Sequence, residues 1–237
     1  MRALLTMILS ICLCTSQAQS LSDLLKPNKT GTGIAGLQQD EIAKGLKEAL
    51  QIGTEKTIQQ LTKTDGFFGN AAIKIIMPPE AEKIEKSLRN LGFNKQVDEA
   101  ILSMNRAAED AAKQAAPLFI KAIQDISLED AMGILRGDDK AATTYLQGKT
   151  NTALTTAFRP SIEQSLEKTG ATKQWNSIVT QYNKFTFKKI NPDLAGYVTE
   201  KSLAGIFTQI AQEEQQIRKD PLARSSDLLK KVFGKSN

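Results

Sequence analysis

The sequence predicts an all-α protein with a single bundle-like domain of about eight helices. Apolar residues recur at spacings of three and four along most of the chain, and Gly or Pro residues divide this pattern into segments of helical length. Two short stretches, 71–77 and 184–190, instead alternate apolar and polar residues. They could pair as a minor two-stranded ribbon on the helical body, although isolated ribbons of two strands are only marginally stable.

The first helix should begin at Asp40, with its apolar residues on one face, and should end before Gly66. After the extended stretch 71–77, Pro78 and Pro79 open a second helix that stops at Gly92. The next pattern runs from Lys95 to Ile126 and predicts one long helix. Its Ala-rich middle would allow a neighbouring helix to approach closely, and Pro117 should bend it.

Ser127 and Asp130 form a capping pair that starts a short helix, which Gly137 closes. Asp138 is placed to cap the following helix, which Pro160 should bend or break before it ends near Lys168. A helix around residues 175–182 and a long last helix from about 193 to 220 follow. A final turn or two, residues 227–233, closes the chain.

The N-terminus has the pattern of a secretory signal peptide, residues 1–18. Arg2 precedes a short apolar run, and small residues at 16 and 18 predict cleavage after Ala18. Cys12 and Cys14 follow large residues rather than the small one that lipid attachment requires, which argues against a lipoprotein. We therefore expect a periplasmic protein with a flexible tether, residues 19–37, a single helical domain, residues 38–237, and no transmembrane span.

Residue types narrow the chemistry. The chain has no His, and both of its Cys lie in the predicted signal peptide. Zinc sites built on Cys or His and nucleophilic triads that use His are therefore excluded, and we expect no metal and no cofactor. The net charge of +5 is too small and too dispersed to indicate nucleic-acid binding.

Several polar residues lie on helix faces that should be apolar. They are Asn105, Arg106 and Glu109, then Glu213, Glu214 and Arg218, with Arg224 and Asp227 after them. The spacing lets Arg106 pair with Glu109 or Asp110, and Arg218 with Glu214, along their own helices. Two interpretations stay open: a structural ion-pair network, or a polar cleft in which Arg106 or Arg218 binds an anion. A pair of carboxylates such as Glu109 and Glu213 would be needed for hydrolysis.

The C-terminal tail is amphipathic and basic. Its apolar residues are Leu228, Leu229, Val232 and Phe233, set among lysines. Such a tail could contact an anionic membrane peripherally or dock onto the bundle.

Several stretches together resemble a family of exported bacterial proteins known as domain of unknown function 4197. They include Gly66-Phe67-Phe68, Asn105-Arg106-Ala107-Ala108-Glu109, Asp130-Ala131, Ala141-Ala142-Thr143 with Tyr145, Tyr197-Val198-Thr199, Glu213-Glu214, Ile217-Arg218, Asp220-Pro221, Ala223-Arg224 and Leu228 to Gly234. The likeness runs from about residue 40 to residue 234. It implies one helical domain after a signal peptide and implies no activity. If the family has a shared site, the resemblance implies that it would be sought at the matching polar positions, which are Asn105, Arg106, Glu109, Tyr145, Glu213, Arg218 and Arg224.

The leading functional hypothesis is a non-enzymatic periplasmic protein that binds another envelope protein or a small ligand. One alternative is a carrier that holds an apolar or anionic ligand in a groove between helices, and another is an envelope hydrolase that uses carboxylates alone. A large apolar groove would favour an apolar ligand. A hydrolase requires two carboxylates facing one cleft. The sequence does not indicate the oligomeric state.

Overall fold

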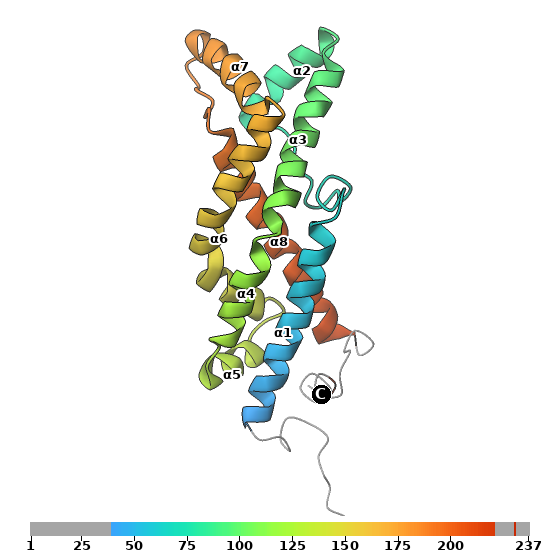
Figure 1. The fold of residues 1–237 in the computed structure, drawn as a ribbon, viewed down its shortest axis with the longest axis vertical. Helices are drawn as coiled ribbons and strands as arrows, with labels where there is room; N and C mark the ends of the chain where they lie inside the picture. Colours follow the sequence, from blue (N-terminus) through green and yellow to red (C-terminus); the bar gives the residue numbers. More distant parts are fainter. Residues whose placement is uncertain (1–38, 221–229, 231–237) are drawn as a thin grey trace, which may run out of the picture. The chain divides into compact units, whose positions relative to one another are not determined.

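A computed structural model describes residues 39–220 and residue 230. Within this part of the chain there are eight α-helices, one short 3-10 helix and no strand, which confirms the all-α prediction (Figure 1). The elements are α1 (Gln39–Leu61), η3 (Pro79–Ala81), α2 (Glu82–Asn90), α3 (Asn94–Ala112), α4 (Ala115–Gln124), α5 (Leu128–Arg136), α6 (Ala141–Lys168), α7 (Ala171–Phe185) and α8 (Leu194–Lys219). None of these helices has the length and hydropathy needed to cross a membrane.

The core lies where α6 packs against α8 and α3, and where α1 packs against α8 and α4. Four alanines of α3 are completely buried: Ala107, Ala108, Ala111 and Ala112. Their small side chains allow close contact between α3 and α6, as the Ala-rich pattern predicted. On α8, Gly205 has the same effect, because a Cβ at this position would lie 2.8 Å from the ring of Phe67.

The prediction of a single helix over residues 95–126 is wrong. The segment is divided at Lys113 and Gln114 into α3 and α4. Pro117 explains the position of the break, since it has no N–H to bond the carbonyl of Lys113 and its ring crowds that carbonyl. Pro117 then lies in the first turn of α4, where Pro is tolerated. In contrast, α6 continues across Pro160 without interruption.

The predicted ribbon between residues 71–77 and 184–190 does not form. Ile75 has both backbone groups bonded by the side chain of Asn105, at 2.9 and 2.7 Å. Ile190 has both bonded by the side chain of Asn183, at 2.8 Å each. An amide side chain thus takes the place of a partner strand in each segment. Residues 184 and 185 belong to α7.

The capping pair that begins α5 is confirmed. The Ser127 side chain accepts from the N–H of Asp130, and the Asp130 carboxylate accepts from the N–H of Ser127, both at 3.0 Å. The signal peptide, the tether, Arg224 and all of the C-terminal tail except Lys230 lie outside the described residues.

Candidate functional site: an apolar groove between α3 and α7

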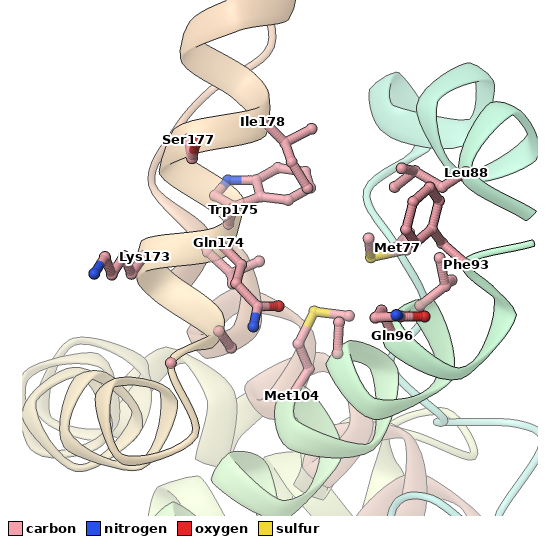
Figure 2. Close-up of a pocket in the computed structure, with 15 residues that line it drawn as sticks. Met77, Leu88, Phe93, Gln96, Met104, Lys173, Gln174, Trp175, Ser177 and Ile178 are labelled. Carbon is pink, nitrogen blue, oxygen red and sulfur yellow. The ribbon is translucent and has the colours of Figure 1, made fainter. Parts of the chain in front are cut away.

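A cavity of about 590 Å³ opens between α7 on one side and α2 and α3 on the other (Figure 2). This volume is within the range of small-molecule binding sites. Its apolar lining residues are Met77, Leu88, Phe93, Val97, Ala100, Met104, Ala171, Trp175, Ile178 and Leu194. The remaining lining residues are Gln96, Gly170, Lys173, Gln174 and Ser177.

One wall of the groove is α7. Gly170, with a φ of 73°, occupies the left-handed region that favours glycine, and it separates the end of α6 from the start of α7. Trp175 and Ile178, three residues apart on α7, then face the cavity (Figure 2). Trp175 is buried, and it is the only tryptophan of the chain.

The opposite wall is α2 with the first half of α3. Ile84, Leu88 and Leu91 are spaced as one helix face, yet no residue of α2 is buried. Leu88 and Phe93 face Trp175 and Ile178 across the gap, and Met77 and Met104 lie between the two walls (Figure 2). Methionine side chains adapt their shape readily, which suits a site that must fit a flexible apolar molecule.

The groove has few polar groups. Gln96 on α3 and Gln174 on α7 contribute the two side-chain amides of the lining, and Met104 lies between them (Figure 2). Lys173 is the single charged lining residue, and its amine points away from the cavity (Figure 2). The groove therefore favours an apolar molecule with at most one small polar group, oriented by the two glutamines.

Asn105, Arg106 and Glu109 lie together on α3, where they hold the loop that follows α1. Besides its two bonds to Ile75, the Asn105 amide donates to the carbonyl of Ile101 at 2.7 Å. Glu109 accepts from the N–H groups of Phe67 and Phe68 at 3.1 and 3.3 Å. The Asn105 amide and the Glu109 carboxylate are thus both bonded to groups of the protein itself.

Arg106 closes the same cluster. Its guanidinium donates to Glu109 at 2.6 Å and to Asp65 at 2.7 Å. The bond to Glu109 is the main reason that the pKa of Arg106 lies above its ordinary value; burial opposes it, and Asp65 adds to it. Two carboxylates thus already occupy the guanidinium that could have bound an anion.

A second cluster joins three helices through Glu214 on α8. Its carboxylate accepts from the N–H groups of Ala142 and Thr143, at 3.0 and 2.9 Å, and from the Thr143 hydroxyl at 2.7 Å. Those N–H groups belong to the first turn of α6, which Glu214 therefore caps from another helix. The Asp138 carboxylate, predicted to cap α6, instead accepts from the N–H of Lys140.

Arg218 completes this second cluster. It donates to Glu214 at 2.9 Å and to the carbonyl of Ile134, near the end of α5, at 2.9 Å. Both of the predicted ion pairs, Arg106 with Glu109 and Glu214 with Arg218, are therefore formed.

The other polar candidates lie apart from these clusters. The Tyr145 hydroxyl donates to Asp130 at 3.3 Å. Burial, followed by the nearby charge of Asp130, raises the pKa of Tyr145. Glu213 pairs with the exposed Lys56 on α1 at 2.6 Å. Glu109 and Glu213 have different partners and do not form an acid–base pair in one cleft.

Among the described residues, the buried carboxylates are Glu109 and Glu214, and each is bonded to an arginine and to backbone N–H groups. In the same part of the chain, no group of three or more His, Cys, Asp or Glu is arranged to hold a metal ion. The apolar groove is a feature of the described chain that offers room for a ligand.

The sequence raised a groove between helices as one alternative, but it did not indicate where the groove lies or which residues line it. Trp175 and Ile178 were recognised as helix residues, but an apolar stripe has the same spacing whether it faces a core or an open groove. The sequence feature that came closest to indicating the groove was α2, a short helix with an apolar face that ends shortly before Gly92.

These features define an all-helical domain with an apolar groove and two internal ion-pair clusters. The chain belongs to the family described as "Protein of unknown function (DUF4197)", whose model matches residues 36–234. This match confirms the resemblance noted from the sequence. Comparison with curated proteins and with solved structures gives no match.

Proposed function

We propose that this protein binds a molecule with an apolar chain, such as a fatty acid or the acyl chain of a lipid, in the groove between α3 and α7. The observation that carries the proposal is the groove itself, with its volume of about 590 Å³ and ten apolar lining residues. A soluble domain gains by covering apolar surface, so an open groove of this kind is stabilised when an apolar molecule fills it.

The distribution of charge supports an apolar ligand over an anionic one. Arg106 and Arg218 are held by Glu109 and Glu214 away from the groove lining. Within the groove, the amides of Gln96 and Gln174 can bond a carboxyl or ester group of the ligand, while the apolar walls take the chain.

Trp175 allows a direct test, because it is the only tryptophan and lines the groove. Purified protein is titrated with dibromostearic acid below its micelle concentration, and tryptophan emission is recorded. Bromine quenches emission only at contact distance, so we expect saturable quenching that unbrominated oleic acid reverses by competition. Absence of quenching, or quenching that oleic acid does not reverse, would refute the proposal.

A matched pair of variants locates the binding. Ala100 is half-buried in the groove wall on α3, and Ala100→Phe fills part of the cavity. It should raise the apparent Kd for the brominated fatty acid at least about tenfold, since even one methylene in a hydrophobic pocket changes the binding free energy by about 1–3 kcal/mol. The control is Ala153→Phe on the exposed side of α6, which should bind as the unaltered protein does. Equal binding by both variants would place the ligand elsewhere.

We also propose that the protein acts in the periplasm after cleavage behind Ala18. The support is the signal-peptide pattern of residues 1–18. Mass spectrometry of the protein from the envelope fraction of its own cells should give a mature chain that begins at Gln19. A full-length chain in the cytoplasmic fraction would contradict this proposal.

A further inference from the structure

The end of α7 and the loop after it carry two phenylalanines that no other described part of the chain covers. Phe185 and Phe187 are 88% and 105% exposed, the highest values among the large apolar residues of the described chain. We call residues 184–189 the α7 tip. Single exposed apolar residues are common, but two neighbouring phenylalanines in full contact with water are costly unless something covers them.

The base of the α7 tip is firmly closed. The Asn183 side chain bonds both backbone groups of Ile190 at 2.8 Å, and the Ile190 side chain is buried in the core. The amine of Lys189 also donates to the carbonyl of Asn183. The loop thus holds Phe185 and Phe187 outward from a fixed base.

The charge around the α7 tip has one sign. From residue 168 to residue 192 the chain contains five lysines and no Asp or Glu: Lys168, Lys173, Lys184, Lys188 and Lys189. The facing wall differs, because α2 carries ion pairs such as Glu82 with Lys86 and Glu85 with Arg89. Lysines that flank exposed phenylalanines are complementary to a surface that is anionic outside and apolar beneath.

The α7 tip lies at the same end of the bundle as the turn between α2 and α3, and α5 lies at the opposite end (Figure 1). That turn adds two exposed apolar side chains, Leu91 at 73% and Phe93 at 45%. Phe93 also lines the groove. The exposed apolar side chains on both walls therefore gather at the end of the bundle where α7 and α2 terminate.

We propose that the α7 tip docks onto a bilayer that contains anionic lipids. Phe185 and Phe187 enter the region between headgroups and acyl chains, and Lys184 and Lys188 lie against the phosphates. The inference goes beyond the groove and does not require the groove to hold a ligand. If both proposals hold, the groove and the membrane contact share one end of the protein.

The test is cosedimentation of the purified protein with vesicles of phosphatidylcholine containing phosphatidylglycerol, and with vesicles of phosphatidylcholine alone. We expect binding to the anionic vesicles that weakens as salt is raised. Phe185→Ser with Phe187→Ser should reduce the partition coefficient at least about tenfold. Lys184→Gln and Lys188→Gln should each reduce it about fivefold.

Matched controls come from the far side of the bundle. Ile52→Ser with Leu128→Ser removes two large apolar residues that are 39% and 37% exposed, and should leave vesicle binding unchanged. Lys121→Gln with Lys140→Gln removes two exposed charges from α4 and from the start of α6 and should have at most a small effect.

Three results would overturn the proposal. The first is no binding to anionic vesicles, and the second is equal loss of binding in the control variants. The third is self-association in analytical ultracentrifugation that the two Phe→Ser substitutions abolish without vesicle binding, which would assign the α7 tip to contact with a second copy. None of these results bears on quenching of Trp175 by brominated fatty acid, so failure here is separable from failure of the groove proposal.

Discussion

Glu214 offers the most demanding test of the structure, since one side chain connects α8 to the first turn of α6. Substitution Glu214→Gln keeps the shape of the side chain but replaces one acceptor oxygen with a donor NH₂ group. The carboxylate accepts from Ala142, Thr143 and Arg218, so either orientation of the amide sets donor against donor. The side chain is only 6% exposed, and water cannot readily substitute for the lost oxygen.

The magnitude follows from these contacts. Hydrogen bonds to a charged group contribute about 1.5–3 kcal/mol each, and breaking a buried ion pair costs about 3–5 kcal/mol. Because Gln retains part of the network, we expect the free energy of unfolding to fall by about 2–4 kcal/mol. Urea unfolding followed by circular dichroism at 222 nm measures this change, with the dependence on urea concentration compared between variants.

The neighbouring residue supplies the control. Glu213→Gln makes the same chemical change one position earlier, but there the partner is Lys56, whose side chain is 59% exposed. Exposed ion pairs contribute little, so this variant should lose about 0.5 kcal/mol. In a double-mutant cycle, Glu214→Gln and Arg218→Gln should couple by at least about 1 kcal/mol. Equal losses for the Glu214 and Glu213 variants would show that Glu214 does not cap α6, and absence of coupling would show that its ion pair with Arg218 does not contribute to stability.

Three further predictions concern other contacts. Asn105→Ala leaves the buried N–H and carbonyl of Ile75 without partners and should lower the free energy of unfolding in urea by about 2–4 kcal/mol. Asn105→Asp should cost at least as much, because a carboxylate cannot donate to the carbonyl of Ile75. Gly205→Ala places a Cβ 2.8 Å from the ring of Phe67 and should cost about 1–3 kcal/mol despite the better helix propensity of Ala; an increase in stability would refute the close contact. Burial raises the pKa of Asp193, but the N–H of Gly196 and the guanidinium of Arg159 together outweigh it and leave the pKa below its ordinary value. Stability from Asp193 should therefore be complete above the ordinary pKa near 4 and be lost as pH falls through the lowered value; carboxyl ¹³C NMR titration that gives an ordinary or raised pKa would contradict this.

The bounds of most helices could be read from the sequence because local signals set them. Ser127 with Asp130, and the left-handed Gly170, mark helix ends through contacts within a few residues. The break at Lys113 was not predicted: the sequence indicated a bend at Pro117 within one helix, whereas Pro117 acts on the carbonyl four residues earlier.

The sequence predicted only part of the bonding in the two polar clusters. The pairing of Arg106 with Glu109 follows from spacing on one helix. The backbone partners of Glu214 lie 71 and 72 residues away, and no periodicity predicts them. The position of the groove was missed for a related reason: whether an apolar face meets a core or an opening depends on where the next helix lies, and local sequence does not determine that.

The packing of α1 against α8 determines when the chain can finish folding. The apolar stripe of α1, which includes Ile42, Leu46 and Leu50, is synthesised first, and α8 is synthesised last. During most of translation this stripe has no α8 to cover it, and closing so long a loop slows the final step. For a chain proposed to leave the cytoplasm, that delay is useful. A nascent chain whose α1 stripe is still uncovered would remain available to chaperones and to a translocation pore.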